Sequence, residues 1–118
     1  MLASRVRLCF SAILIIAALV GCSGERGSTE SLGTAEQQHK AAELLYKQNC
    51  KVCHAQGING APIVGNKKMW ADRLPQGVDV LVKHAVEGYG LMPAKGGKDH
   101  LTEAEIRQIV EYYVAMAN

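Results

Sequence analysis

Apolar residues recur along this chain of 118 residues mainly at helical spacing. Residues 35–49 carry apolar side chains on one helical face, with Gln, Lys and Glu between them, which predicts a helix. A second stripe covers residues 78–86 and is closed by Gly88. The alternation of apolar and polar residues over 78–80 also fits a strand, but the longer apolar stripe and the closing glycine favour a helix.

The last apolar stripe follows a capping box. Thr102 can accept the exposed amide of Glu105, whose carboxylate can reach back to the start of the helix. Residues 69–74 predict a short helical turn, and the glycine- and proline-containing segments 55–68 and 88–100 predict loops. The pattern therefore predicts an all-α domain of three or four short helices joined by glycine-rich loops.

The first residues have the layout of a bacterial export signal. Arg5 and Arg7 precede an uncharged apolar run from Leu8 to Val20. This run of 13 residues is short for a bilayer span, which needs about 20 residues. A removable signal is therefore favoured, and a permanent membrane-anchor helix is the alternative.

The end of this signal resembles a bacterial lipobox, because Cys22 follows Leu19-Val20-Gly21. That resemblance implies cleavage before Cys22 and lipidation of its sulfur, which would hold the protein on a membrane. Ordinary cleavage a residue or two later, with a soluble periplasmic product, is the alternative. We therefore divide the chain into a lipoprotein-type signal peptide (1–21), a flexible linker rich in Ser, Gly and Glu (22–34) and one domain (35–118).

The charge of the chain does not imply a nucleic-acid partner. Removal of Arg5 and Arg7 with the signal reduces the 13 basic residues to 11, which equals the 11 acidic residues. Residues 40–98 nevertheless hold nine basic and four acidic side chains. If these lysines gather on one face, they would steer an acidic partner toward it.

The segment CKVCH, residues 50–54, carries the candidate chemistry. Cys9 would leave with the signal and Cys22 would be lipidated, so Cys50 and Cys53 remain. A thioredoxin-like redox pair would need a strand followed by a helix start, and a zinc site would need a second ligand pair. Covalent attachment of haem c fits better, since Cys-x-x-Cys-His is its signature and His54 would then ligate the iron. A haem would also complete the core of a small domain with few aromatic residues.

Met92 is the candidate for the second axial iron ligand. It lies in the segment Gly90-Leu91-Met92-Pro93, where glycine lets the backbone approach a ring closely and proline keeps Met92 extended. His84 and His100 are the rival ligands. Met69 and Met116 suit packing better, because one precedes a tryptophan in a short turn and the other lies near the C-terminus.

With Cys50, Cys53, His54 and Met92, the chain resembles the class I c-type cytochromes, and among them the small bacterial cytochromes c5. The resemblance covers residues 38–116 and rests on matching segments in the same order: CKVCH, GINGAPIVGN, Trp70 with Arg73, GYGLMPAKGG and LTEAEIRQIVEYY. Many cytochromes c5 carry a second cysteine pair after the methionine loop, and this chain has no cysteine there. The resemblance implies a small class I cytochrome c fold wrapped around one covalently attached haem c.

The resemblance also implies roles for single residues. It places three residues where the first and last helices cross: Ala42, Tyr46 and Tyr112. Pro62 matches the proline whose neighbouring carbonyl accepts the second ring proton of the ligand histidine. Trp70 and Arg73 match positions close to the haem propionates, and a core tryptophan with a surface arginine is the alternative.

The resemblance implies a one-electron carrier that links respiratory redox partners, a reductase and a terminal oxidase or reductase, in the bacterial periplasm. With both axial positions filled, no substrate reaches the iron, so we expect no catalytic residue. Five lysines are expected to border the exposed haem edge: Lys51, Lys67, Lys68, Lys95 and Lys98. The alternatives are a haem enzyme or gas sensor with an open sixth iron position, and a structural lipoprotein in which CKVCH is accidental.

Overall fold

The computed structural model describes residues 27–118, and the side chains from residue 33 onward. Its longer helices are α1 (Gly27–Asn49), α4 (Val78–Glu87) and α5 (Glu103–Ala117). Single turns form α2 (Lys51–His54) and α3 (Lys67–Trp70), together with the 3₁₀ turns η1 (Ile58–Gly60), η2 (Leu74–Gln76) and η3 (Ala94–Gly97). The described part of the chain contains no strand beyond one isolated bridge, so the predicted all-α class is confirmed.

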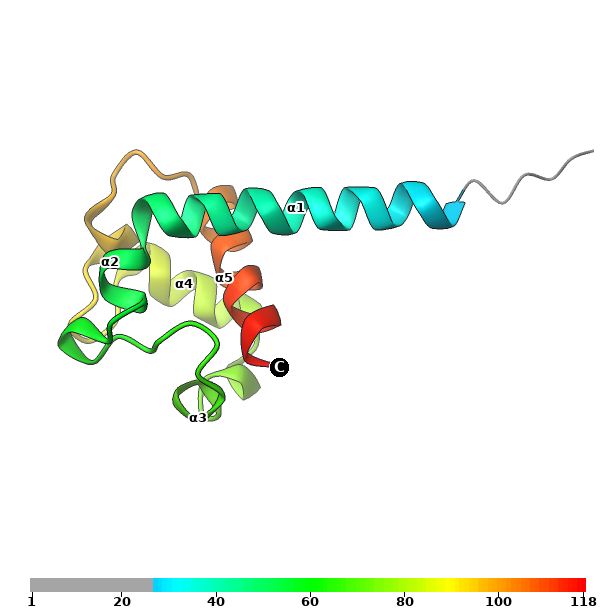
Figure 1. Ribbon diagram of the computed structural model, residues 1–118. Helices are drawn as coiled ribbons and strands as arrows, with labels where there is room; N and C mark the ends of the chain where they lie inside the picture. Colours follow the sequence, from blue (N-terminus) through cyan, green and yellow to red (C-terminus); the bar gives the residue numbers. More distant parts are fainter. Residues whose placement is uncertain (1–26) are drawn as a thin grey trace, which may run out of the picture.

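Helix α1 begins earlier than the sequence pattern suggests. Residues 27–34, expected to belong to a flexible linker, are helical from Gly27 onward. A helix can propagate through polar residues, and the Glu36–Lys40 ion pair of 2.6 Å supports it one turn further on. Residues 33–41 are all exposed, and this half of α1 projects from the body of the protein (Figure 1). The predicted signal peptide and Cys22 lie outside the described residues.

Helices α1 and α5 cross over a small residue and a cluster of tyrosines. Ala42 is buried, and the Tyr46 ring lies 5.7 Å from Tyr112 and 5.5 Å from Tyr113 between ring centroids. The absence of a large side chain at Ala42 lets the two helices approach closely. This is the crossing that the resemblance implied for Ala42, Tyr46 and Tyr112, and it packs α5 against α1 (Figure 1).

Helices α4 and α5 pack side by side and complete the core. Residues 78–86 are helical, so the strand alternative for this segment was wrong. The capping box begins α5 as predicted: the Glu105 amide donates to Thr102 Oγ1 at 3.2 Å, and the Thr102 amide donates to Glu105 Oε2 at 2.8 Å. Arg107 on α5 pairs with Asp79 on α4 at 2.8 Å, which links the two helices at the surface.

Within residues 27–118, no helix is both long enough and apolar enough to cross a membrane.

Candidate functional site

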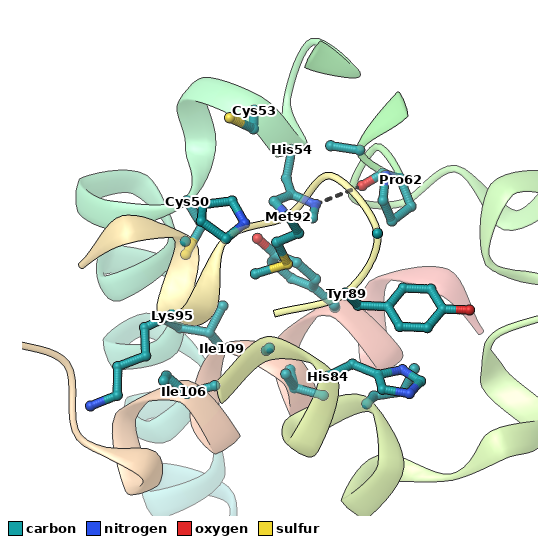
Figure 2. A pocket seen from close by; sticks show the side chains of 18 of the residues that line it. Cys50, Cys53, His54, Pro62, His84, Tyr89, Met92, Lys95, Ile106 and Ile109 are labelled. Atoms are coloured by element: carbon teal, nitrogen blue, oxygen red, sulfur yellow. Dashed lines mark hydrogen bonds between the residues drawn. The ribbon is translucent and has the colours of Figure 1, made fainter. Parts of the chain in front are cut away.

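A cavity of about 730 Å³ opens beside the segment CKVCH. Its volume lies within the range of about 300–1,000 Å³ that small-molecule and cofactor sites occupy. Helices α4 and α5 contribute an apolar wall that consists of Leu81, Ala85, Ile106, Ile109 and Val110. All four residues predicted to bind the cofactor line this cavity (Figure 2): Cys50, Cys53 and His54 come from CKVCH, and Met92 comes from the loop after α4.

Cys50 and Cys53 stand at one side of the cavity as free thiols. Cys50 lies between α1 and α2, where its amide donates to the Tyr46 carbonyl at 2.9 Å, and its side chain is half-buried. Burial raises the pKa of the Cys50 thiol. An activated redox cysteine has a lowered pKa and follows a strand, so the thioredoxin-like reading is disfavoured.

The zinc alternative also lacks its ligands. Within residues 27–118, no group of three His, Cys, Asp or Glu side chains is placed so that it could hold a metal ion. A structural zinc site needs four such ligands. Cys50, Cys53 and His54 therefore do not form a protein-only zinc site in this part of the chain.

His54 is held as a neutral ring with one free nitrogen. Its ring is buried, and Nδ1 lies 2.9 Å from the Pro62 carbonyl oxygen (Figure 2). Because a carbonyl can only accept, Nδ1 carries the proton and Nε2 keeps its lone pair. Burial lowers the pKa of His54, which favours the uncharged form that a metal requires. The His54–Pro62 contact agrees with the role that the resemblance implied for Pro62.

The loop that carries Met92 is a tight turn closed on itself. The Tyr89 amide donates to the Met92 carbonyl and the Met92 amide donates to the Tyr89 carbonyl, each at 3.0 Å. Gly90, with φ of 60°, takes the first central position of this two-residue connection, which is typical of a type II′ turn. Met92 is half-buried, and its side chain lines the same cavity as His54 (Figure 2). The turn therefore fixes which way the methionine faces.

The rival axial ligands are less well placed. His84 lines the cavity, but its ring stacks on Tyr89 with 4.2 Å between centroids and an interplanar angle of 22° (Figure 2). His100 is exposed, does not line the cavity, and its Nε2 lies 3.1 Å from Asn49 Oδ1. Two other methionines, Met69 and Met116, are also absent from the lining.

Trp70 and Arg73 both line the cavity, on the side of α3. Trp70 is buried and its indole N–H donates to the Ile63 carbonyl at 2.9 Å, while the Arg73 guanidinium donates to the Met69 carbonyl. Their predicted place beside the haem propionates remains a prediction. Both side chains also brace the segment between η1 and η2, because their donors go to backbone carbonyls there.

The lysines expected near the site divide into two groups. Lys95 and Lys98 line the cavity, and Lys95 Nζ donates to the Leu101 carbonyl at 2.9 Å. The other three, Lys51, Lys67 and Lys68, are exposed outside the lining. Two apolar side chains of the lining, Val52 and Leu91, are 71% and 75% exposed, so the opening has an apolar rim beside its lysines.

Sequence reasoning missed two tyrosines of the site. No site role was predicted for Tyr113 in the last helix, yet it lines the cavity and its ring lies 5.2 Å from the His54 ring. Tyr89 holds the methionine turn through its backbone. The Gly90-Leu91 pair is typical of a hairpin turn and could have indicated that Tyr89 pairs with Met92 across it.

Comparison with known proteins places this site in a family. Residues 37–112 match the protein family described as "Cytochrome C oxidase, cbb3-type, subunit III". Cytochrome c-555 of Chlorobaculum tepidum is 42% identical over 81 residues, which cover 65% of this chain and 75% of that protein. The chain belongs to the class I c-type cytochromes. Members of this family carry one covalently attached haem c, so the predicted cofactor is confirmed.

Two further matches show which other cytochromes this chain is similar to. Cytochrome c5 of Ectopseudomonas mendocina is 28% identical over 74 residues, covering 61% of this chain and 85% of that protein. A cytochrome fold in the crystal structure of an electron transfer complex of nitrite reductase with cytochrome c has a TM-score of 0.63. The matched chain in that structure is 42% identical, and the match covers 66% of this chain and 95% of the matched chain. This chain is therefore more similar in sequence to that cytochrome c-555 and to the matched chain of the complex than to that cytochrome c5.

The residues of the cavity fit a haem. The wall from α4 and α5 is apolar, as a porphyrin face requires, and the two free thiols of the attachment motif lie at one side. His54 presents a neutral Nε2 whose partner nitrogen is already bound to the Pro62 carbonyl. Met92 adds a soft thioether to the same cavity.

Proposed function

We propose that this cytochrome holds one haem c through thioether bonds from Cys50 and Cys53, with His54 and Met92 as the axial iron ligands, and that it carries single electrons between redox proteins. One observation supports this proposal most strongly. Both thiols, a neutral imidazole and a thioether line one apolar cavity of about 730 Å³, although Met92 is remote from CKVCH in the sequence.

Bound haem c supplies an iron that cycles between Fe(II) and Fe(III). The Pro62 carbonyl holds the Nδ1 proton of His54, so the imidazole keeps one tautomer and one orientation in both oxidation states. The Met92 thioether is a soft ligand that favours Fe(II) and raises the reduction potential. Apolar side chains such as Leu81 and Ile109 keep water away from the site, which also raises the reduction potential.

Electron transfer rather than catalysis is the activity that this ligand set supports. With His54 and Met92 on the iron, no coordination position remains for a substrate. The alternative, a haem enzyme or gas sensor, requires Met92 to leave the iron in its working state. The double backbone pairing of Met92 with Tyr89 opposes such a movement.

The partners we propose are redox proteins with an acidic face. Lys95 and Lys98 stand at the opening, next to the exposed apolar side chains of Val52 and Leu91. Lysines beside an apolar rim would guide brief docking through charge and then exclude water from the contact. The solved complex of a similar cytochrome c with nitrite reductase supports reductases as one partner class.

The location we propose is the bacterial periplasm, with lipidated Cys22 as a membrane anchor. The apolar run and lipobox-like end of residues 1–22 support both parts of this proposal. The half of α1 that projects from the body would then act as a helical spacer between the anchor and the haem domain (Figure 1). Expression of Cys22→Ser tests the anchor: the variant should move from the membrane to the soluble periplasmic fraction, and unchanged fractionation would refute lipidation.

The carrier function is tested by a redox titration of the purified full-length protein combined with exposure of the reduced protein to carbon monoxide. A carrier gives a reversible one-electron titration and resists carbon monoxide. Rapid binding of carbon monoxide to the reduced protein would instead support the enzyme or sensor alternative.

A further inference from the structure

Tyr113 carries a buried hydroxyl that has no partner. The side chain is 4% exposed, and within the described part of the chain its Oη makes no hydrogen bond. Buried tyrosine hydroxyls are normally paired, and leaving one unpaired costs about 1–3 kcal/mol. Phenylalanine would fill the same space without that cost. The hydroxyl therefore points to a partner at the cavity that Tyr113 lines.

The ring of Tyr113 is held firmly by three aromatic neighbours. Tyr46 and Trp70 meet it edge to face, at 5.5 and 5.4 Å between ring centroids, and His54 lies at 5.2 Å. This packing leaves the ring little freedom to swing its hydroxyl toward another part of the protein. The hydroxyl must find its partner in the cavity that Tyr113 lines together with Cys50.

The neighbouring tyrosine has a different environment. Tyr112 is also buried on α5, but it does not line the cavity and packs against Tyr46 and His39 at the crossing with α1. The two successive tyrosines thus face different surroundings from the same helix. Tyr112 serves the helix crossing, and only Tyr113 presents its hydroxyl to the haem site.

We propose that Tyr113 is a positioning residue for the haem attachment, and that its hydroxyl donates a hydrogen bond to the sulfur of Cys50 when that sulfur is part of a thioether. Thioether sulfur is a weak acceptor and has no proton to offer in return, so the tyrosine must be the donor. Cys50 is half-buried against the same core, whereas Cys53 is exposed. The inference rests on the proposed function, because it requires Cys50 to carry the haem.

The electrostatics of the two side chains agree with this pairing. Burial raises the pKa of the Cys50 thiol. The next strongest influence is the Tyr113 hydroxyl, which lowers the pKa of that thiol. Burial raises the pKa of the Tyr113 hydroxyl. A donor at the Cys50 sulfur withdraws electron density from that substituent of the porphyrin. It should therefore favour Fe(II) and raise the reduction potential.

The test compares Tyr113→Phe with Tyr112→Phe in the haem-loaded full-length protein. Each variant loses one tyrosine hydroxyl from the same helix and keeps its ring, so both should fold. The reduction potential and the carbon–sulfur stretching bands in the resonance Raman spectrum are measured. Tyr113→Phe should lower the potential and shift one carbon–sulfur band, whereas Tyr112→Phe should leave both as in the unchanged protein.

Three results would overturn the inference. These are an unchanged potential in Tyr113→Phe, a lowered potential with unmoved carbon–sulfur bands, and equal shifts in both variants. The first two would mean that the hydroxyl does not act through the sulfur, and the third that the effect comes from packing. A haem-loaded protein with methionine ligation that gives any of these results refutes this inference alone, whereas a parent protein without haem refutes the proposed function.

Discussion

Tyr89 and Met92 bind each other through both of their backbone groups, with two hydrogen bonds of 3.0 Å that close a two-residue turn. The backbone of the loop therefore sets the direction of the Met92 side chain. Two neighbouring features hold the turn in place: Gly88, the C-cap of α4, lies against the Met92 carbonyl, and His84 of α4 stacks on the Tyr89 ring. The consequences can be tested one residue at a time.

Gly88→Ala should disturb the methionine ligand, whereas Gly77→Ala should not. Both glycines adopt nearly the same backbone conformation at the two ends of α4, with φ of 89° and 85°, where any other residue costs about 1–3 kcal/mol. A Cβ on Gly88 would lie 2.9 Å from the Met92 carbonyl oxygen, while a Cβ on Gly77 meets no atom within 4 Å. Both variants should lose stability in denaturant titrations. Only Gly88→Ala should weaken the ferric absorption band of methionine ligation, and equal weakening in both would contradict this.

Met92→Ala should keep the covalent haem but change the iron. Loss of the thioether lowers the reduction potential, because the soft ligand favours Fe(II). It also opens a coordination position, so the reduced variant should bind carbon monoxide. Met69→Ala is the control, since Met69 packs against the core outside the cavity and its loss should reduce stability only. If the Met92 variant still resists carbon monoxide, another residue is the ligand.

His84→Ala should loosen the methionine turn without removing a ligand. The stack on Tyr89, at 4.2 Å between ring centroids, is worth about 0.5–1.5 kcal/mol by comparison with other aromatic pairs. The methionine absorption band should therefore disappear at a lower denaturant concentration than in the parent, ahead of global unfolding. His84→Phe should restore the parent behaviour, and His100→Ala, at an exposed histidine outside the cavity, should not change the band. A band that disappears in His84→Ala at the same denaturant concentration as in the parent would contradict this role of the stack.

Stability should fall in acid partly because Glu105 loses its charge. The Thr102 amide and hydroxyl lower the pKa of Glu105 in the folded protein below its ordinary value of 4.5. A lowered folded-state pKa means that this contribution is fully present above the unfolded pKa and is lost as the pH falls through the folded pKa. Glu105→Gln can keep the capping hydrogen bonds but does not titrate, so its free energy of unfolding should depend less on pH in this window. Glu103→Gln removes a charge from the same helical turn, and an equal effect there would contradict the role of the capping box.

Much of the architecture could be predicted from the sequence, because its signals are local. The apolar stripe before Gly88 and the capping box of Thr102 and Glu105 each depend on residues within one or two helical turns, and both helices formed as predicted. The motif CKVCH and the exposed-loop character of the Met92 segment are equally local. The chemistry of a thioether and an imidazole then suggested that the two segments meet.

What could not be predicted depends on contacts between distant segments. The unpaired hydroxyl of Tyr113 follows from how α5 packs on α1 and α2, and helical periodicity does not distinguish it from Tyr112, which lies next to it. The stack of His84 on Tyr89 likewise depends on the path of the loop after α4. The start of α1 at Gly27 was missed because polar residues permit a helix without requiring one.

The most direct test of the central claim, a haem bound covalently at Cys50 and Cys53, is the intact mass of the mature protein under denaturing conditions after expression with a working cytochrome maturation system. The account predicts a mass increased by one haem, which persists on the denatured chain and is lost when both cysteines are replaced by alanine. A denatured chain with the mass of the polypeptide alone, or an increase that survives replacement of both cysteines, would contradict it.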